Sequence, residues 1–443
     1  MRYFAVSGAT MISGTSPGTR FGSRWVMLGL LFCAYALSGA DRQLVAVLAE
    51  PIRKDLGLSD SQLGMLSGLA FALFYTVFAI PIAWLADRTN RIATIAFSCL
   101  VWSLSTAGCG IAGNYLQLAL WRVGVATGEA GASPSAHSLI SENFPPERRG
   151  MALALYSIGL PVGIAAGTAY GGWIGSLYGW RSAFLWISVP GIVLSLLLLL
   201  LVRTAHNAPE LKGSAAHKAP PPLPLRETLR GFCKNPVLWQ TTFAGSMAAL
   251  SSYALMVWIP AFLMREKGMS LADIARSYSV LSGSAMVVGM IAGGLLVDRW
   301  QRRDPRASAM IPALAYLAAA PLVLMAIWAN DWRVCLALLA VPLALMMTWL
   351  PPALATVQNA ADPRQRSVVS AIFMLVTGII GNGAGPLVVG LLSDAFAPIA
   401  PGRSLHWALT AMCPVLLVVS MSYFGLQRTL MRGYGGETRT AGA

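Results

Sequence analysis

Four ionisable side chains lie where the surrounding sequence is almost wholly apolar. Asp41 and Arg42 fall inside the apolar stretch 25–50, and Arg122 and Glu129 fall inside 115–142. A charge among apolar residues costs free energy, so such residues mark sites of function. A buried carboxylate takes up a proton when a neighbouring guanidinium moves away, and a guanidinium can hold an anionic group. We therefore expect Asp41 to be the first proton-coupling residue and Glu129 the second, with binding of a cationic group as the other possible role of Glu129.

The depths of these residues allow them to meet if both stretches are helices that cross a membrane. At 1.5 Å of rise per residue, Asp41 lies ~13 Å from the outer end of its stretch. Arg122 and Glu129 lie ~10 Å and ~21 Å from the outer end of theirs. Two pairings are therefore possible, Asp41 with Arg122 and Arg42 with Glu129. A static network of ion pairs that fixes the register of the helices is the alternative to a substrate-binding and proton-coupling site.

Two further polar residues continue the face that carries Arg122 and Glu129. Ser133 and His137 follow Glu129 at intervals of four, which places them one above the other on one side of a helix. We expect them to extend the charge network or the substrate site. For His137, a structural histidine with satisfied hydrogen bonds is as plausible as a proton relay.

The composition requires most of the chain to lie in a membrane. Hydrophobic residues make up 56% of the 443 residues and charged residues only 11%, about half the charge of a soluble protein. The net charge of +14 does not indicate nucleic-acid binding, because the basic residues form short clusters between apolar stretches. The six cysteines contain no CxxC pair and no histidine cluster accompanies them, so we expect no metal site and no cofactor.

The apolar runs predict an all-α integral membrane protein with twelve transmembrane helices. A spanning helix needs about 20 mainly apolar residues. The first such run extends past Ala40 and more follow, so it is a first helix and not a signal peptide. The predicted spans are 25–50, 62–86, 92–112, 115–142, 150–175, 182–203, 237–264, 273–297, 308–328, 332–356, 367–395 and 404–427.

A proline-rich and basic stretch divides the spans into two sets of six. Residues 205–236 have the composition of a linker, which ends in a predicted short basic helix at 225–234. The expected organisation is an N-terminal tail at 1–24, a six-helix bundle at 25–204, the linker at 205–236, a second bundle at 237–428 and a C-terminal tail at 429–443.

Lysine and arginine are distributed unequally between the two sides of these spans. Of the 32 basic residues, 22 fall on the side of the tails and the linker and 8 on the other side. Basic residues are enriched in cytoplasmic loops. We therefore expect a multi-pass protein of the cell (inner) membrane with both termini and the linker in the cytoplasm.

The two halves of the chain repeat a short motif. Ala83-x-Leu85-x-Asp87-Arg88-x-x-Arg91 ends the second span, and Gly294-x-Leu296-x-Asp298-Arg299-x-x-Arg302 ends the eighth, 211 residues later. Many secondary transporters consist of duplicated six-span halves with the substrate site between them. The repeat predicts two pseudo-symmetric bundles.

This loop motif and Arg122 resemble the major facilitator superfamily over the whole chain. Ala83 and Asn90 stand where that family usually has glycine. The stretches Gly39–Ala46, Leu56–Gly64 and Arg122–Ala130 are similar to the spinster branch. Spinster proteins move lysophospholipids and sphingosine 1-phosphate, and some use a proton gradient, so the resemblance implies an amphiphilic, lysolipid-like or sphingolipid-like substrate.

The resemblance also implies a conformational latch at the cytoplasmic ends of the spans. Asp87 would face the start of span 11 near Ser367, where the positive end of the helix favours an anion. Arg88 and Arg91 would hold neighbouring helix ends in the outward-open state. Asp298 and Arg299 form the weaker copy.

The second half carries no charge in the centre of spans 7, 8, 10 and 11. Its methionines and aromatic residues are expected to pack as in an ordinary helix bundle or to form an adaptable apolar wall for an amphiphile. We expect a secondary active transporter that works by alternating access, acts as a monomer among membrane lipids and moves a small amphiphilic molecule coupled to protons. The alternative is a facilitative or antiport carrier of a hydrophilic or drug-like molecule. Neither a GxxxxGK loop nor a Ser/His or metal constellation at membrane depth occurs, so we do not expect an enzyme.

Overall fold

The fold is entirely helical in the residues that the structure describes. The computed structural model describes residues 21–201, 225–301, 303–304, 306–362 and 365–440. Residues 1–20 of the predicted tail (1–24) and residues 205–224 of the predicted linker (205–236) lie outside these ranges. The short helix predicted at the end of the linker is present as α9 (Leu225–Lys234).

The described part of the first half, residues 21–201, contains eight helical elements. They are α1 (Phe21–Val47), α2 (Ala49–Leu56), α3 (Asp60–Ser67), α4 (Leu69–Arg88), α5 (Arg91–Gly110), α6 (Tyr115–Ala130), α7 (Ala132–Asn143) and α8 (Pro146–Leu201).

The second half begins with α9. It continues with α10 (Pro236–Lys267), α11 (Leu271–Asp273), the π-helical segment η1 (Ile274–Tyr278), α12 (Ser279–Gln301), α13 (Ala307–Trp328), α14 (Trp332–Leu345), α15 (Leu350–Ala360), α16 (Arg366–Thr377), the π-helical segment η2 (Gly378–Ala384), α17 (Gly385–Phe396) and α18 (Ser404–Thr440).

Twelve crossings of a membrane account for these helices. Ten described helical stretches are long and apolar enough to span a bilayer. One of them, Pro146–Leu200, is far longer than the ~20 residues of one crossing, and it bends at Gly179, whose φ is 82°. It therefore supplies the predicted spans 5 and 6. The pair α6 and α7, which is interrupted at Gly131, is not among the ten stretches and supplies span 4. The predicted fold class is confirmed.

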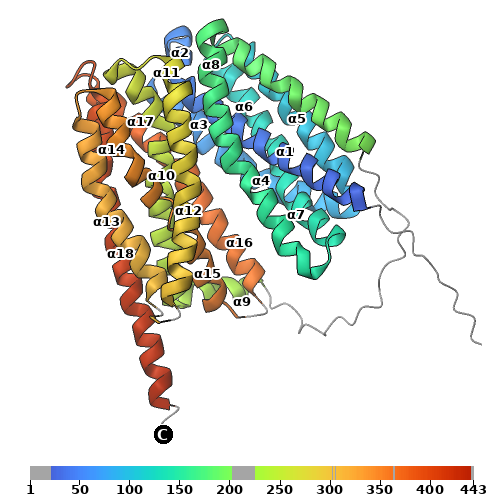
Figure 1. Cartoon of the computed structure of the whole chain (residues 1–443), viewed down its shortest axis with the longest axis vertical. Helices are drawn as coiled ribbons and strands as arrows, with labels where there is room; N and C mark the ends of the chain where they lie inside the picture. Colours follow the sequence, from blue (N-terminus) through green and yellow to red (C-terminus); the bar gives the residue numbers. More distant parts are fainter. Residues whose placement is uncertain (1–20, 202–224, 302, 305, 363–364, 441–443) are drawn as a thin grey trace, which may run out of the picture.

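The last helix is longer than predicted. The sequence predicted that span 12 ends at 427 and that a tail follows from 429, whereas α18 continues to Thr440. Its last proline is Pro414, so no later residue removes a backbone donor from the helix. Figure 1 shows this helix extending well beyond the rest of the bundle.

Helices α1 and α8 pack with almost no space between their backbones. A Cβ atom on Gly163 would lie 1.9 Å from the carbonyl oxygen of Ala36. A Cβ atom on Gly39 would lie 2.7 Å from the carbonyl oxygen of Leu160. Small residues allow this approach in a membrane, where dispersion contacts replace the hydrophobic driving force. The contact fixes α1, which carries Asp41 and Arg42, against its own half.

The repeat of 211 residues extends to the turns between spans. Gly57 and Gly268 both have positive φ, 64° and 66°, a conformation that glycine adopts without steric cost. Two residues later, Ser59 caps α3 and Ser270 caps α11, each by accepting a hydrogen bond from the backbone three residues on. The two halves therefore enter their second spans through matching turns.

The two halves meet at one end and diverge at the other. Between them, α3 packs on α17, α4 on η2, α8 on η1 and α12, and α1 on α10. Figure 1 shows the bundles close together where α2 and α11 lie and apart toward α7 and α16. We call these the closed end and the open end. The start of α1 and the end of α18 both lie away from the closed end (Figure 1).

Candidate functional site

Three of the four predicted membrane charges are almost completely buried. Asp41 is 1% exposed, and Arg122 and Glu129 are each 2% exposed. Asp41 and Arg42 come from α1, and Arg122 and Glu129 from α6, so the first half supplies them all. We call these four residues the central cluster.

The structure contains one of the two predicted pairings. Arg42 Nε donates to Glu129 Oε2 at 2.7 Å, and the Ser38 hydroxyl donates to the same oxygen at 2.7 Å. The other carboxylate oxygen, Oε1, is buried and accepts no hydrogen bond. Glu129 is thus held by one oxygen and has an unused acceptor.

The pairing of Asp41 with Arg122 is absent. Thr106 donates to Asp41 Oδ2 at 3.2 Å, and Asp41 Oδ1 is buried with no hydrogen-bond partner among the described residues. Arg122 Nε is also buried without a partner. The pair was predicted only from the similar depths of Asp41 and Arg122 in the membrane. Depth does not determine which face of its helix a side chain lies on. The result is a buried carboxylate and a buried guanidinium that each keep unused hydrogen-bonding capacity.

An aromatic residue that the sequence did not single out connects the two arginines. The guanidinium carbons of Arg42 and Arg122 lie 4.9 and 5.1 Å from the centre of the Phe71 ring. Arg42 also lies 5.1 Å from the Tyr75 ring. Cations are stabilised over aromatic faces at such distances. No pattern in the sequence distinguishes Phe71 from the other aromatic residues of span 2.

A cavity of about 50 Å³ lies beside the central cluster, between the two halves. Arg42, Arg122 and Phe71 line it from the first half, and Tyr253, Met256 and Asn382 are among the residues that line it from the second. Asp41 and Glu129 do not border this cavity. Its charged lining is therefore purely cationic, with a largely apolar remainder.

Ser133 and His137 lie away from this cavity. Ser133 borders a separate, smaller cavity together with Glu129, Tyr35 and Tyr156. The exposed His137 packs edge-on against Tyr156, with 5.2 Å between ring centres. Ser133 is thus next to Glu129, whereas His137 packs on an aromatic residue outside the central cluster.

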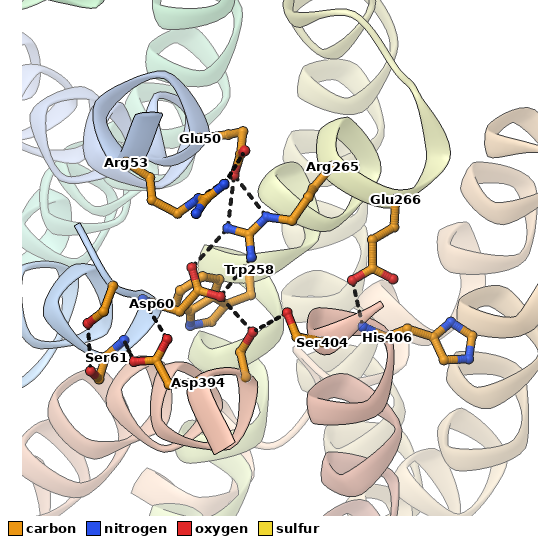
Figure 2. A network of polar contacts seen from close by, with 12 residues as sticks. Glu50, Arg53, Asp60, Ser61, Trp258, Arg265, Glu266, Asp394, Ser404 and His406 are labelled. Atoms are coloured by element: carbon orange, nitrogen blue, oxygen red, sulfur yellow. Dashed lines mark hydrogen bonds and ion pairs between the residues drawn. The ribbon is translucent and has the colours of Figure 1, made fainter. Parts of the chain in front are cut away.

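A second polar network joins the two halves at the closed end (Figure 2). Arg265, at the end of α10, donates to Asp60 of α3 through Nη1 at 2.7 Å and Nη2 at 2.8 Å. The same guanidinium donates from Nε to Glu50 of α2 at 2.9 Å. All three side chains are largely buried, with Arg265 the most exposed at 13%. Bidentate hydrogen bonds between a guanidinium and a carboxylate are strong and directional.

The second half also caps a helix of the first. Asp394 of α17 accepts hydrogen bonds from the backbone nitrogens of Asp60 and Ser61, at 3.0 and 2.8 Å, at the start of α3. Ser393 donates to Asp60 Oδ2 at 2.6 Å. Helix starts have unpaired N–H groups and a partial positive charge, so a carboxylate stabilises them. We call Glu50, Asp60, Arg265, Ser393 and Asp394 the closed-end network.

The basic partners of Glu50 determine its protonation. Burial alone would raise the pKa of Glu50, but the hydrogen bonds and charges of Arg53 and Arg265 outweigh burial and hold the pKa below its ordinary value. Nearby, the hydrogen bond from Arg181 lowers the pKa of Asp55. Both carboxylates are therefore charged at neutral pH.

The chain matches known proteins along nearly its whole length. A family model of the Major Facilitator Superfamily matches residues 31–386. The chain belongs to the Major Facilitator Superfamily. It is 34% identical over 416 residues to an "MFS-type efflux pump" of Mycolicibacterium smegmatis, covering 93% of each chain. It is 26% identical over 424 residues to "Protein spinster homolog 1" of Xenopus laevis, covering 90% of this chain and 79% of the other.

Among solved structures, a bacterial homologue of the human lysosomal transporter spinster in an inward-facing, unoccupied conformation is similar. It is 28% identical, with a TM-score of 0.83, and the match covers 93% of this chain and 98% of the other. These matches confirm the prediction of a spinster-like secondary transporter of the Major Facilitator Superfamily. Membership of a transporter family also agrees with the expectation that the protein is not an enzyme.

The superfamily loop motif is only partly described. The side chain of Asp87 and that of Ser367 lie outside the described residues, so their predicted contact stays a prediction. Arg88 lies over the Trp84 ring, 3.9 Å from its centre, and Arg91 forms an ion pair with Glu142 of α7. The second copy, Asp298 and Arg299, is exposed.

Asn90, which replaces a family glycine in this motif, has a local role. Its side chain accepts hydrogen bonds from the backbone nitrogens of Ile92 and Ala93 and so caps α5. An asparagine N-cap stabilises a helix more than glycine does.

The sequence reasoning missed the closed-end network entirely. In the sequence, Arg265 is one of the eight basic residues on the side opposite the tails, and Asp60 is part of the stretch Leu56–Gly64 that is similar to spinster proteins. A signal existed, because Asp60 follows the Ser59 cap, and Leu271 replaces it at the equivalent position of the repeat. An acidic residue present in one half alone suggests a partner in the other half.

Proposed function

We propose that this transporter moves a small amphiphilic molecule with an anionic, lysolipid-like headgroup, and that protons drive the transport. The observation that carries the proposal is the cavity between the halves, where Arg42 and Arg122 are the only charged residues in the lining. Two guanidiniums without a carboxylate favour an anion. The aromatic and aliphatic lining suits an attached apolar group.

Glu129 and Asp41 provide the coupling to protons in this proposal. An anion that enters the cavity competes with Glu129 for Arg42, whose Nε now binds Glu129 at 2.7 Å. Once released, Glu129 no longer has Arg42 as its partner, and we propose that it exchanges a proton at this step. Asp41 already has a buried oxygen without a partner, and we propose it as the first proton acceptor.

The closed-end network suits alternating access, because opening this end requires separation of Arg265 from Glu50 and Asp60. We infer that the closed end faces the outside, since 22 of the 32 basic residues fall on the opposite side. The similarity to an inward-facing spinster homologue supports the same orientation.

Transport into proteoliposomes tests this function. A labelled lysophospholipid should accumulate faster when a pH gradient is imposed than at equal pH on both sides. Asp41→Asn should abolish that difference while the purified protein stays folded, as judged by size-exclusion chromatography. An Asp41→Asn protein that retains the full pH dependence would rule out the coupling role.

A carrier of drug-like molecules in the same fold is the second candidate, and the name of the 34% identical efflux pump favours it. Thermal shift measurements separate the two. Lysophospholipids should stabilise this protein and cationic dyes should not, because a cation in the cavity would face Arg42 and Arg122. Stabilisation by dyes alone would favour the second candidate.

A further inference from the structure

The segment η2 interrupts the middle of span 11 beside the cavity. Its seven residues, Gly378–Ala384, are π-helical, and single π-helical turns inside α-helices are frequent at functional sites. Gly381 packs on Ala249 of α10, where an added Cβ would lie 2.3 Å from the alanine side chain. A Cβ on Gly68, at the start of α4, would lie 2.4 Å from the carbonyl oxygen of Gly383. Tight packing on both sides therefore holds the segment in place.

Asn382 is the polar side chain that this segment brings to the cavity. It lines the same space as Arg42 and Arg122, from the opposite half. Its amide oxygen Oδ1 is buried and accepts no hydrogen bond from any described residue. A buried acceptor without a partner costs free energy, so a ligand group that donates to it gains affinity.

An anionic headgroup alone cannot satisfy this oxygen. The guanidiniums of Arg42 and Arg122 are donors, whereas an ionised carboxylate or phosphate has only acceptors. Placed between them and Asn382, such an anion meets donors on one side and an acceptor on the other. A ligand that carries a hydroxyl or ammonium group next to its anionic group would match both sides.

We propose that Asn382 is a specificity residue that selects amphiphilic anions with a hydrogen-bond donor beside the charged group. This inference rests on the proposed function, because it takes the cavity as the headgroup site. It adds a requirement that Arg42 and Arg122 do not impose. It also adds a polar group from the second half to the apolar lining expected there.

The size of the cavity agrees with such a headgroup. A space of about 50 Å³ holds a few water-sized groups, which suits a carboxylate or phosphate with one neighbouring hydroxyl. The apolar chain of the ligand must extend past the lining, where Phe71, Ile164 and Met256 are apolar.

Two matched ligands test the selection in binding measurements at pH 8. Dodecanoate carries only the anion, and 2-hydroxydodecanoate adds one donor beside it. Wild-type protein in nanodiscs should bind the hydroxy acid about fivefold more tightly, the value of one hydrogen bond. Asn382→Leu should remove this preference and leave the affinity for dodecanoate nearly unchanged.

Two further variants control for folding and for general damage near the cavity. Asn382→Ser keeps an acceptor and should retain part of the preference if the leucine variant does not fold. Thr377→Val changes the residue directly before η2, whose hydroxyl donates to the backbone of its own helix and does not line the cavity, so the preference should persist.

Two results would overturn the inference on Asn382 while leaving the proposed function intact. One is equal binding of both acids by the wild type, and the other is a preference that survives in Asn382→Leu. If the wild type binds neither acid, the anionic headgroup site itself is wrong, and both proposals fail.

Discussion

Arg265 and Asp60 are 205 residues apart in sequence, belong to opposite halves of the transporter, and are joined by two hydrogen bonds of 2.7 and 2.8 Å. The same guanidinium reaches Glu50, so one cation of the second half holds two carboxylates of the first. Any motion that separates the halves at this end must break all of these contacts together.

Arg265→Ala should therefore shift the protein toward states that are open at the closed end. Removal of one member of a buried charged group costs about 3–5 kcal/mol, and here the lost interactions connect the halves. The shift is measurable as longer distances between spin labels at exposed Ser176 and exposed Arg333, introduced in a variant without the native cysteines.

Lys54→Ala provides the matched control for that experiment. Lys54 also pairs with Glu50, at 3.6 Å, but its side chain is 70% exposed and belongs to the same half. Exposed pairs contribute little, so the distances should stay as in the wild type. Equal behaviour of the two variants would contradict the role assigned to Arg265.

Asp394→Ala should destabilise the contact between the halves by about 1 kcal/mol, the usual value of a lost helix cap. The physical reason is that the carboxylate caps α3 from the opposite half. Label distances across the closed end should increase, and the melting temperature should fall.

A cap within one half gives the comparison for Asp394. Asp331 caps α14 of its own half by accepting from the backbone nitrogen of Arg333. Asp331→Ala should lower the melting temperature without a change in the distances across the closed end. If Asp394→Ala also lowers the melting temperature without changing these distances, the cap that Asp394 provides does not help to hold the closed end together.

Acidification should weaken the closed end. The pKa of Glu50 lies below its ordinary value of 4.5 because Arg53 and Arg265 outweigh the effect of burial. The contribution of Glu50 to closure is therefore complete above pH 4.5 and is lost as the pH falls through the lowered pKa. Label distances measured from pH 7 to pH 3 should rise in the acid range, and Glu50→Gln should show a smaller rise. An identical acid transition in Glu50→Gln would assign it to other carboxylates.

Glu129→Gln should increase the affinity for an anionic amphiphile such as dodecanoate, by about tenfold or less. The substitution removes the charge that now neutralises Arg42 at 2.7 Å, and a charged hydrogen bond is worth about 1.5–3 kcal/mol, part of which the neutral glutamine keeps. Calorimetric titration at pH 8 measures the change. Arg122→Gln should act in the opposite direction, and weaker binding by both variants would argue against competition for Arg42.

The apolar runs of the sequence were sufficient to predict the membrane helices, because a helix in lipid must satisfy its own backbone and bury about 20 apolar residues. Arg42 and Glu129 lie at similar depths along their spans, so the sequence predicted their ion pair as one of two possible pairings. The pair of Asp41 with Arg122 failed because depth does not determine rotation of a helix about its axis.

The contacts between the halves could not be predicted in the same way. Asp60 and Arg265 lie at the ends of spans, where charged residues face water by default and carry no signal of pairing. In the sequence, Asn382 is one polar residue in a glycine-rich stretch. A π-helical turn cannot be recognised from hydrophobic periodicity. Both features depend on how the two bundles are positioned against each other.

The contact between glycine-rich α8 and α1 has a consequence for the proposed coupling of protons to substrate. Because the carbonyl of Ala36 occupies the place of a side chain on Gly163, α1 is packed tightly on α8 of its own half, and Glu129 of α6 belongs to that same half. A movement of the two halves against each other therefore does not by itself separate Arg42 from Glu129. Under the proposed function, a competing ligand or a proton exchanges the partners, so the cargo would be selected before the halves move.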